Sequence, residues 1–301
     1  MGRSASAQRV FLDRRTIDAF TAYMANRTDA GFGRILATPG GELAYAHYKW
    51  ASVTPQESIE VFWKEVLGSV KWSSRLATTI EDNISHLKAR RKAWIEAVLQ
   101  YLPRGHALNS KVHLVGGYDN VVYGENVAVN LADERFVDDY REATYYLIHE
   151  LAHAGYFRYR AMPDLAGIKT LHELAETVKL LTHLEGMGVL SSFKLRMKEG
   201  GLADSDYKVL LDRGQRKARV REYFELLRDL ENVPDRKIRE SDYKILGDFS
   251  RRPKRLWYIT GCHMAMMIEE RYGIRELQDE VKKGHRAFFD AYARVEDPLQ
   301  L

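Results

Sequence analysis

The chain has 301 residues, of which 45% are hydrophobic and 29% are charged, and its formal net charge is +4. These values are typical of a globular protein that buries a core, as one large domain or two smaller ones. The single cysteine, Cys262, excludes an internal disulfide, so stability does not depend on oxidising conditions. No run is apolar and long enough for a signal peptide or a membrane span, and we expect a cytoplasmic protein.

Three basic clusters stand out in the sequence, "KARRKAW", "RGQRKARVR" and "RRPKRLW". Acidic residues are interleaved nearby, a pattern that is typical of solvated helix faces. We interpret the clusters in this way and do not expect a nucleic-acid partner. The alternative is a helical nucleic-acid-binding protein, whose binding would weaken steeply with salt.

The N-terminal third of the chain predicts helices. Thr54 as N-cap, Pro55 at the first helical position and Glu57 as capping-box partner predict a helix start within "TPQESIEVFW". Apolar residues at helical spacing predict a long helix over about 74–102, which the next residue, a proline, ends. We therefore expect residues 1–105 to form an all-helical N-terminal region.

The segment from Ser110 to Leu131 has the residue pattern of β-strands rather than of helices. In "KVHLVGGYDNVVYGENVAVNL", apolar and polar residues alternate around glycine-containing turns, which predicts two or three short strands.

The remaining helices are predicted over residues 138–158, 171–197, 207–232, 257–271 and 275–294. The expected fold is mainly α, of the α+β class, with a small β-sheet over the 138–158 helix and helical segments on both flanks. The expected core covers 106–200, and a C-terminal helical region, 201–301, packs on it.

The stretch "HELAH" carries the clearest chemistry. On a helix, His149 and His153 lie on one face about one turn apart, so both imidazoles can reach one Zn²⁺ ion. Glu150 projects about 100° round the helix, beside such an ion, where it can take a proton from bound water. The flanking residues are apolar, and burying these polar groups without a partner would be costly. The pattern therefore predicts a zinc site for hydrolysis.

A catalytic zinc needs a third protein ligand, and "EGMG" downstream contains Glu185. HExxH followed by a helix with Glu-Gly-x-small resembles the gluzincin branch of the zincin metallopeptidases. The resemblance implies Glu185 as the third ligand. Its spacing departs from the family, because Glu185 lies 32 positions after His153 (185 − 153), whereas family members have about 20. Glu173 stands at the shorter spacing, and Glu176, nearby, points to the opposite side of the helix from Glu185.

The resemblance also implies features around the metal. A zincin sheet has an edge strand that pairs with an extended substrate, and residues 124–131, "GENVAVNL", are the candidate for it. A donor from a segment after the third ligand stabilises the oxyanion. Tyr258 is the first candidate and His263 the second, with Gly261 between them allowing close helix packing. Tyr156, directly after the motif, is an alternative.

These features together predict a zinc metallopeptidase that hydrolyses peptides or proteins. Zinc would be held by His149, His153 and Glu185, and zinc-bound water would attack the peptide bond with Glu150 as general base and then proton donor. The alternative is a zinc-containing protein that binds peptides without cleaving them, although such a protein has no need of Glu150. Whether peptides are cut internally or from one end stays open, as does the oligomeric state.

Overall fold

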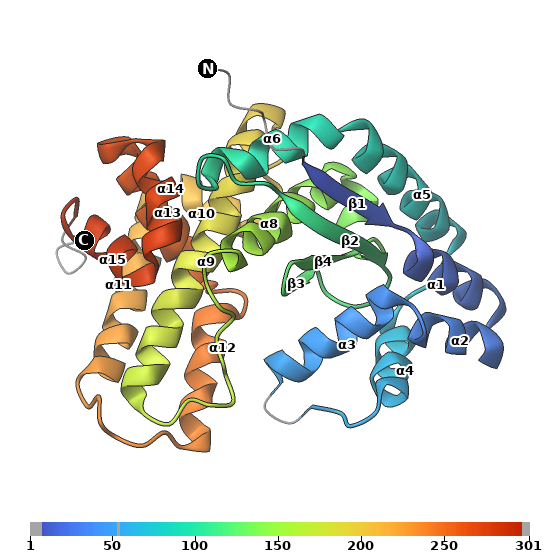
Figure 1. Cartoon of the computed structure of the whole chain (residues 1–301), viewed down its shortest axis with the longest axis horizontal. Helices are drawn as coiled ribbons and strands as arrows, with labels where there is room; N and C mark the ends of the chain where they lie inside the picture. Colours follow the sequence, from blue (N-terminus) through green and yellow to red (C-terminus); the bar gives the residue numbers. More distant parts are fainter. Residues whose placement is uncertain (1–7, 53–54, 297–301) are drawn as a thin grey trace. The chain divides into compact units, whose positions relative to one another are not determined.

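The computed structural model describes residues 8–52 and 55–296, and the chain divides into two compact units (Figure 1). Unit 1 comprises Met1–Leu99 and Gly105–Arg158, and unit 2 comprises Gln100–Arg104 and Tyr159–Leu301. The chain is mainly helical and contains a small mixed sheet of four strands, as the predicted class requires. Within the described ranges, no helix combines the length and the apolar character that a membrane crossing needs.

Unit 1 contains the sheet and the helices around it. Its elements are β1 (Arg9–Asp13), α1 (Arg15–Asn26), α2 (Asp29–Leu36), α3 (Pro39–Ala51), α4 (Ile59–Ser69), α5 (Ser74–Ala89), α6 (Arg91–Tyr101), β2 (Asn109–Val115), β3 (Val121–Tyr123), β4 (Asn126–Asn130), α7 (Arg135–Asp138) and α8 (Arg141–Phe157). The last two residues of α6 belong to unit 2. The predicted helix that carries "HELAH" is therefore confirmed as α8.

The sheet has the strand order β1-β2-β4-β3, with β1, β2 and β4 parallel and β3 antiparallel to β4. One face packs on α3, where Leu43 clusters with Val115, Val121 and Ala128. Helix α8 packs against β3 and β4, and Figure 1 shows it on the other side of the sheet from α3. The predicted small sheet thus lies over the helix that carries the histidines.

Two predictions about strands are wrong. Residues 1–105 are not all helical, because β1 pairs with β2 from Arg9 opposite Asn109 to Asp13 opposite His113. This strand depends on a partner 100 positions later, which local pattern does not reveal (109 − 9). The segment 124–131 is not an edge strand either, since its strand β4 lies between β2 and β3. The edges of this sheet are β1 and β3.

The helices of unit 1 differ from the prediction in two places. Helix α4 begins at Ile59, and its N-cap is Ser58, whose hydroxyl accepts a hydrogen bond from the backbone N–H of Glu60. Pro55 and Glu57 precede this helix, and Thr54 lies outside the described residues. The helix predicted over 74–102 is two helices, α5 and α6, which meet at Arg90.

Unit 2 is helical. Its elements are α9 (Leu171–Glu199), α10 (Ser205–Leu211), α11 (Arg213–Glu231), the 3₁₀ turn η1 (Glu240–Tyr243), α12 (Lys244–Ser250), α13 (Leu256–Tyr272), α14 (Ile274–Lys283) and α15 (His285–Ala293). The helices predicted over 207–232 and 275–294 are each divided. Asp212 ends one and caps α11 by accepting hydrogen bonds from two backbone N–H groups, whereas Gly284, at φ 100°, separates α14 from α15.

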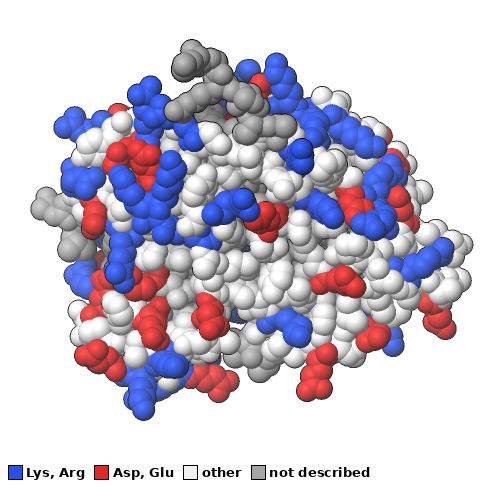
Figure 2. All heavy atoms as spheres, in the orientation of Figure 1, with Lys and Arg blue, Asp and Glu red and all other residues white. Residues whose placement is uncertain are grey.

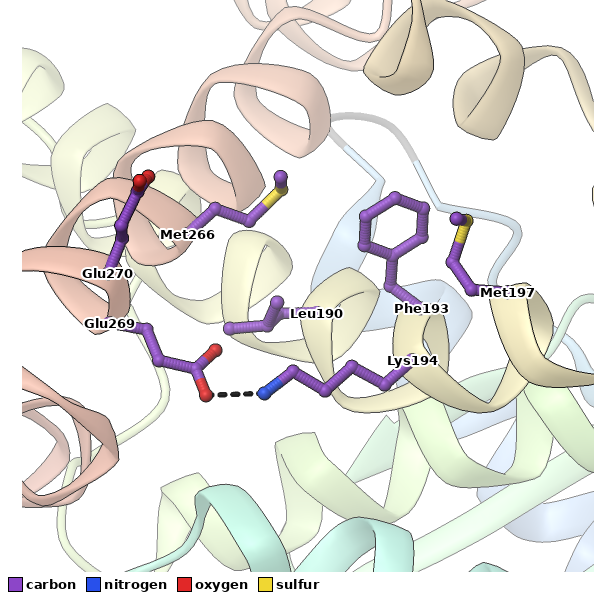
Figure 3. A pocket seen from close by; sticks show the side chains of 7 residues that line it. All are labelled: Leu190, Phe193, Lys194, Met197, Met266, Glu269 and Glu270. Carbon is purple, nitrogen blue, oxygen red and sulfur yellow. Dashed lines mark hydrogen bonds and ion pairs between the residues drawn. The ribbon is translucent and has the colours of Figure 1, made fainter.

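Helices α9 and α13 pack most closely where two glycines meet. A Cβ atom on Gly186 would lie 2.4 Å from the Cα of Gly261, and a Cβ on Gly261 would lie 2.0 Å from the carbonyl oxygen of Thr182. The close packing predicted for Gly261 is therefore confirmed. Further along, the two helices line an apolar pocket of about 460 Å³ (Figure 3). Its lining residues are Leu190, Phe193, Lys194, Met197, Met266, Glu269 and Glu270, none of them a predicted site residue.

Candidate metal centre

Helix α8 is buried along most of its length, because apolar residues occupy nearly every side of it. The helical repeat places Tyr146, His149, Glu150 and His153 on neighbouring positions of one face. Glu150 and His153 are 6% and 4% exposed, whereas His149 is half-buried. The motif therefore combines an apolar helix with a short polar stripe that is largely withdrawn from water.

The three motif side chains converge. The imidazole centroids of His149 and His153 are 4.4 Å apart, and Oε2 of Glu150 lies 3.5 Å from Nδ1 of His153. One ligand atom from each of the three residues lies within 4.8 Å of the others. In the part of the chain that the structure describes, no other group of His, Cys, Asp or Glu side chains meets this spacing.

This donor set fits the preferences of Zn²⁺, which takes imidazole nitrogen and carboxylate oxygen at about 2.0–2.2 Å. The donor atoms of His149 and His153 are close enough for small side-chain rotations to bring both onto one ion. The geometry thus supports two histidine ligands from a single helix turn, with the Glu150 carboxylate immediately beside them.

Two further residues of unit 1, Asp119 and Arg135, interact with the stripe, and the sequence did not single them out. Desolvation raises the pKa of the Asp119 carboxyl although its side chain keeps exposed surface, and the nearby charge of Glu150 raises it further. Arg135 donates a hydrogen bond to the hydroxyl of Tyr146 and lies 4.6 Å above its ring. Nε of Arg135 also donates to Oδ1 of Asp133 at 2.8 Å. The one feature of the sequence that could have pointed to this surrounding is Tyr146, which lies three residues before His149 and therefore on the same face of the helix.

The third predicted ligand and the first oxyanion candidate belong to unit 2, where Glu185 on α9 and Tyr258 on α13 are both half-buried. Arg255 connects them. Its guanidinium carbon lies 3.3 Å from the centroid of the Tyr258 ring. Burial opposes the charge of Arg255, but the pKa of Arg255 is raised on balance, and Tyr258, Asp206 and Glu185 all contribute. Unit 2 thus brings Glu185 and Tyr258 to the same arginine.

The two alternative carboxylates are engaged by neighbours within unit 2. Glu173 is exposed and accepts hydrogen bonds from the backbone N–H groups of Lys169 and Thr170, which closes the capping box of α9. Glu176 lies 2.6 Å from Nε of Arg286 and 3.2 Å from Nε2 of His285. Glu173 therefore stabilises the start of α9, and Glu176 helps to pack α15 against α9.

The other two oxyanion candidates are deeply buried. Nε2 of His263 lies 2.9 Å from Oε2 of Glu296, and its ring meets Tyr292 edge to face. Burial lowers the pKa of His263, against the opposing effect of Glu296. Tyr156 is only 1% exposed. His263 and Tyr156 thus lack the partly open setting of Tyr258.

The basic clusters form ion pairs with acidic neighbours. Arg252 pairs with Asp204 at 2.8 Å, and Lys254 and Arg219 both pair with Glu222. Basic and acidic side chains also intermingle on the molecular face in Figure 2. The charges of these clusters are thus partly balanced within the fold, as expected of solvated helix faces.

Comparisons of the chain with protein-family models, with curated proteins and with solved structures gave no match. The likeness to zincin metallopeptidases therefore depends on the "HELAH" turn, on the Glu-Gly helix and on the geometry described above.

Proposed function

We propose that this protein is a zinc-dependent peptidase. The observation that carries the proposal is the convergence of His149, Glu150 and His153, whose ligand atoms lie within 4.8 Å on one turn of a buried helix. A purely structural zinc site is normally closed by four protein ligands and has no use for a carboxylate base. The Glu150 carboxylate next to two imidazoles thus favours hydrolysis over a structural role.

His149, His153 and Glu185 would hold the metal. When bound, zinc would polarise the scissile carbonyl and lower the pKa of the attacking water. Glu150 would accept the proton of that water on its carboxylate and then deliver it to the leaving amine nitrogen. Its position suits this role, because the carboxylate is buried and lies 3.5 Å from the imidazole of His153, beside the place where the metal would be held.

Tyr258 would donate a hydrogen bond from its phenol to the oxygen that becomes negative as water attacks. It is half-buried, and its ring is held against Arg255. A fixed donor is effective in this role because it needs no reorganisation when the charge develops. His263 is only 3% exposed and is hydrogen-bonded to Glu296, so it is the second choice for this role.

The substrate would be an extended peptide segment. Strand β3 is an edge of the sheet and packs against α8, so its outer side offers backbone groups next to the helix that carries the motif. An extended peptide can add to such an edge through backbone hydrogen bonds. This assigns substrate pairing to Val121–Tyr123 in place of the segment 124–131.

The experiment that tests the function is the Glu150→Gln variant, assayed against a peptide library. We expect zinc to remain bound and cleavage to fall by about 10²–10⁴-fold, because Gln cannot accept the proton. The matched control is Glu142→Gln, the same change at another buried glutamate of α8, which should leave cleavage close to wild type. Equal cleavage by wild type and Glu150→Gln would refute the assigned base.

A further inference from the structure

Arg255 has an unusual backbone conformation. It precedes the first residue of α13 at φ 51° and ψ 42°, and its side chain makes no capping bond to that helix. The left-handed region is uncommon for a residue with a Cβ atom, and such strain persists only where surrounding contacts maintain it. The contacts of the Arg255 side chain therefore require an explanation.

The guanidinium of Arg255 is held from two sides. Its Nε lies 2.9 Å from Oδ2 of Asp206, and its carbon lies 3.3 Å from the centroid of the Tyr258 ring. The side chains of Arg255 and Asp206 are 21% and 9% exposed. A planar guanidinium can stack on an aromatic ring and donate hydrogen bonds in its own plane at once. Arg255 thus restrains the plane of the Tyr258 ring.

Glu185 enters the same arrangement from α9. Its negative charge is one of the causes that raise the pKa of Arg255, after the opposing effect of burial and the contributions of Tyr258 and Asp206. Helices α9 and α13 also approach closely beside Glu185, because Gly186, the next residue, lies against Gly261 of α13. The charge of Arg255 therefore acts on both unit 2 residues that the proposed reaction uses.

We propose that Arg255 is a positioning residue that fixes the Glu185 carboxylate and the Tyr258 phenol in the geometry the zinc site needs. The proposal rests on the proposed function and adds the element that orients its two unit 2 members. Asp206 anchors the guanidinium, the guanidinium stacks on Tyr258, and its charge attracts Glu185. Arg255 touches neither water nor peptide in this account, and it acts only through its two neighbours.

The test is Arg255→Lys, which keeps the positive charge but loses the planar stack and the in-plane donors. Zinc affinity of the metal-free protein should fall about tenfold or more, as for other groups that orient metal ligands. kcat should fall with KM nearly unchanged, since only the geometry of the reacting groups changes. The control is Arg236→Lys, at a residue whose guanidinium forms a two-point pair with Asp242 instead, and it should alter neither quantity by more than about twofold.

A double-mutant cycle with Tyr258→Phe separates positioning from a general structural effect. If Arg255 acts through the Tyr258 phenol, Arg255→Lys should reduce kcat much less in the Tyr258→Phe background than in wild type. If Arg255→Lys does not fold, Asp206→Asn weakens the anchor of the guanidinium, together with the longer 3.7 Å pair between Asp206 and Arg252, and should give the same pattern. If the wild type binds zinc and Arg255→Lys has the same zinc affinity and kcat as the wild type, this proposal is refuted and the proposed function is not. Absence of zinc from the wild type would refute the proposed function as well.

Discussion

The "HELAH" turn of unit 1 and the Glu185 region of unit 2 are assembled in different ways. In unit 1, His149, Glu150 and His153 meet because one helix repeats every 3.6 residues. In unit 2, the charge of Glu185 on α9 acts on Arg255 at the start of α13, and these two helices pack closely at two glycines. A site made by one helix survives as long as that helix forms, whereas a site made by packing depends on the contact between two helices.

Among the changes that test this difference, Gly261→Ala is expected to have the largest effect on stability, because it acts on the contact between α9 and α13. The added Cβ would lie 2.0 Å from the carbonyl oxygen of Thr182, so the helices must separate. Overpacking of this kind costs about 1–3 kcal/mol of unfolding free energy, which urea titration measures. The matched control is Gly33→Ala in α2, where the new Cβ meets nothing within 4 Å, and it should be neutral or slightly stabilising. Wild-type stability in Gly261→Ala would contradict the close packing.

A smaller effect is expected in unit 1, at the carboxylate of Asp13. Its hydrogen bond to Arg15 is the main cause that lowers its pKa from 3.8 to about 2, and Nδ1 of His113 lies 3.2 Å away. Because the pKa is lowered in the folded state, the stabilisation is complete above the unfolded value and is lost as pH falls from about 4 to about 2.

Asp13→Asn should therefore cost about 1 kcal/mol at pH 7, with the difference shrinking below pH 4. Urea titrations at pH 7, 4 and 3 measure this dependence. Asp18→Asn, at a carboxylate that is 54% exposed, is the control and should change stability by less than about 0.5 kcal/mol. A difference between wild type and Asp13→Asn that stays constant down to pH 3 would contradict the assignment.

The same contrast explains what the sequence could predict. The α8 and α9 helices were recognisable because their residue pattern is local. Strand β1 was not recognisable, since its five residues become a strand only by pairing with β2. The start of α4 was misplaced because Thr54-Pro55 imitates a cap that Ser58 provides.

The residues of the candidate site likewise fall into those that local spacing predicts and those that only the folded chain brings together. His149, Glu150 and His153 follow from spacing alone, because their geometry is that of one helix turn. Asp119 lies in the loop between β2 and β3, and the charge of Glu150, 31 positions later (150 − 119), reaches it only in the folded chain. The role of Arg255 was equally hidden, because its anchor, Asp206, lies 49 positions earlier in the chain on another helix.

The most direct test of the account is the zinc content of the purified protein, measured for wild type, Glu185→Ala and Glu173→Ala after each has been offered zinc. The account predicts near-stoichiometric zinc in wild type and in Glu173→Ala, because Glu173 serves only the capping box of α9, and a large loss in Glu185→Ala. Zinc retained in Glu185→Ala and lost in Glu173→Ala would show that Glu173, and not Glu185, is the third ligand. A wild type that binds no zinc would contradict the central claim, and the peptidase proposal would then have to be abandoned.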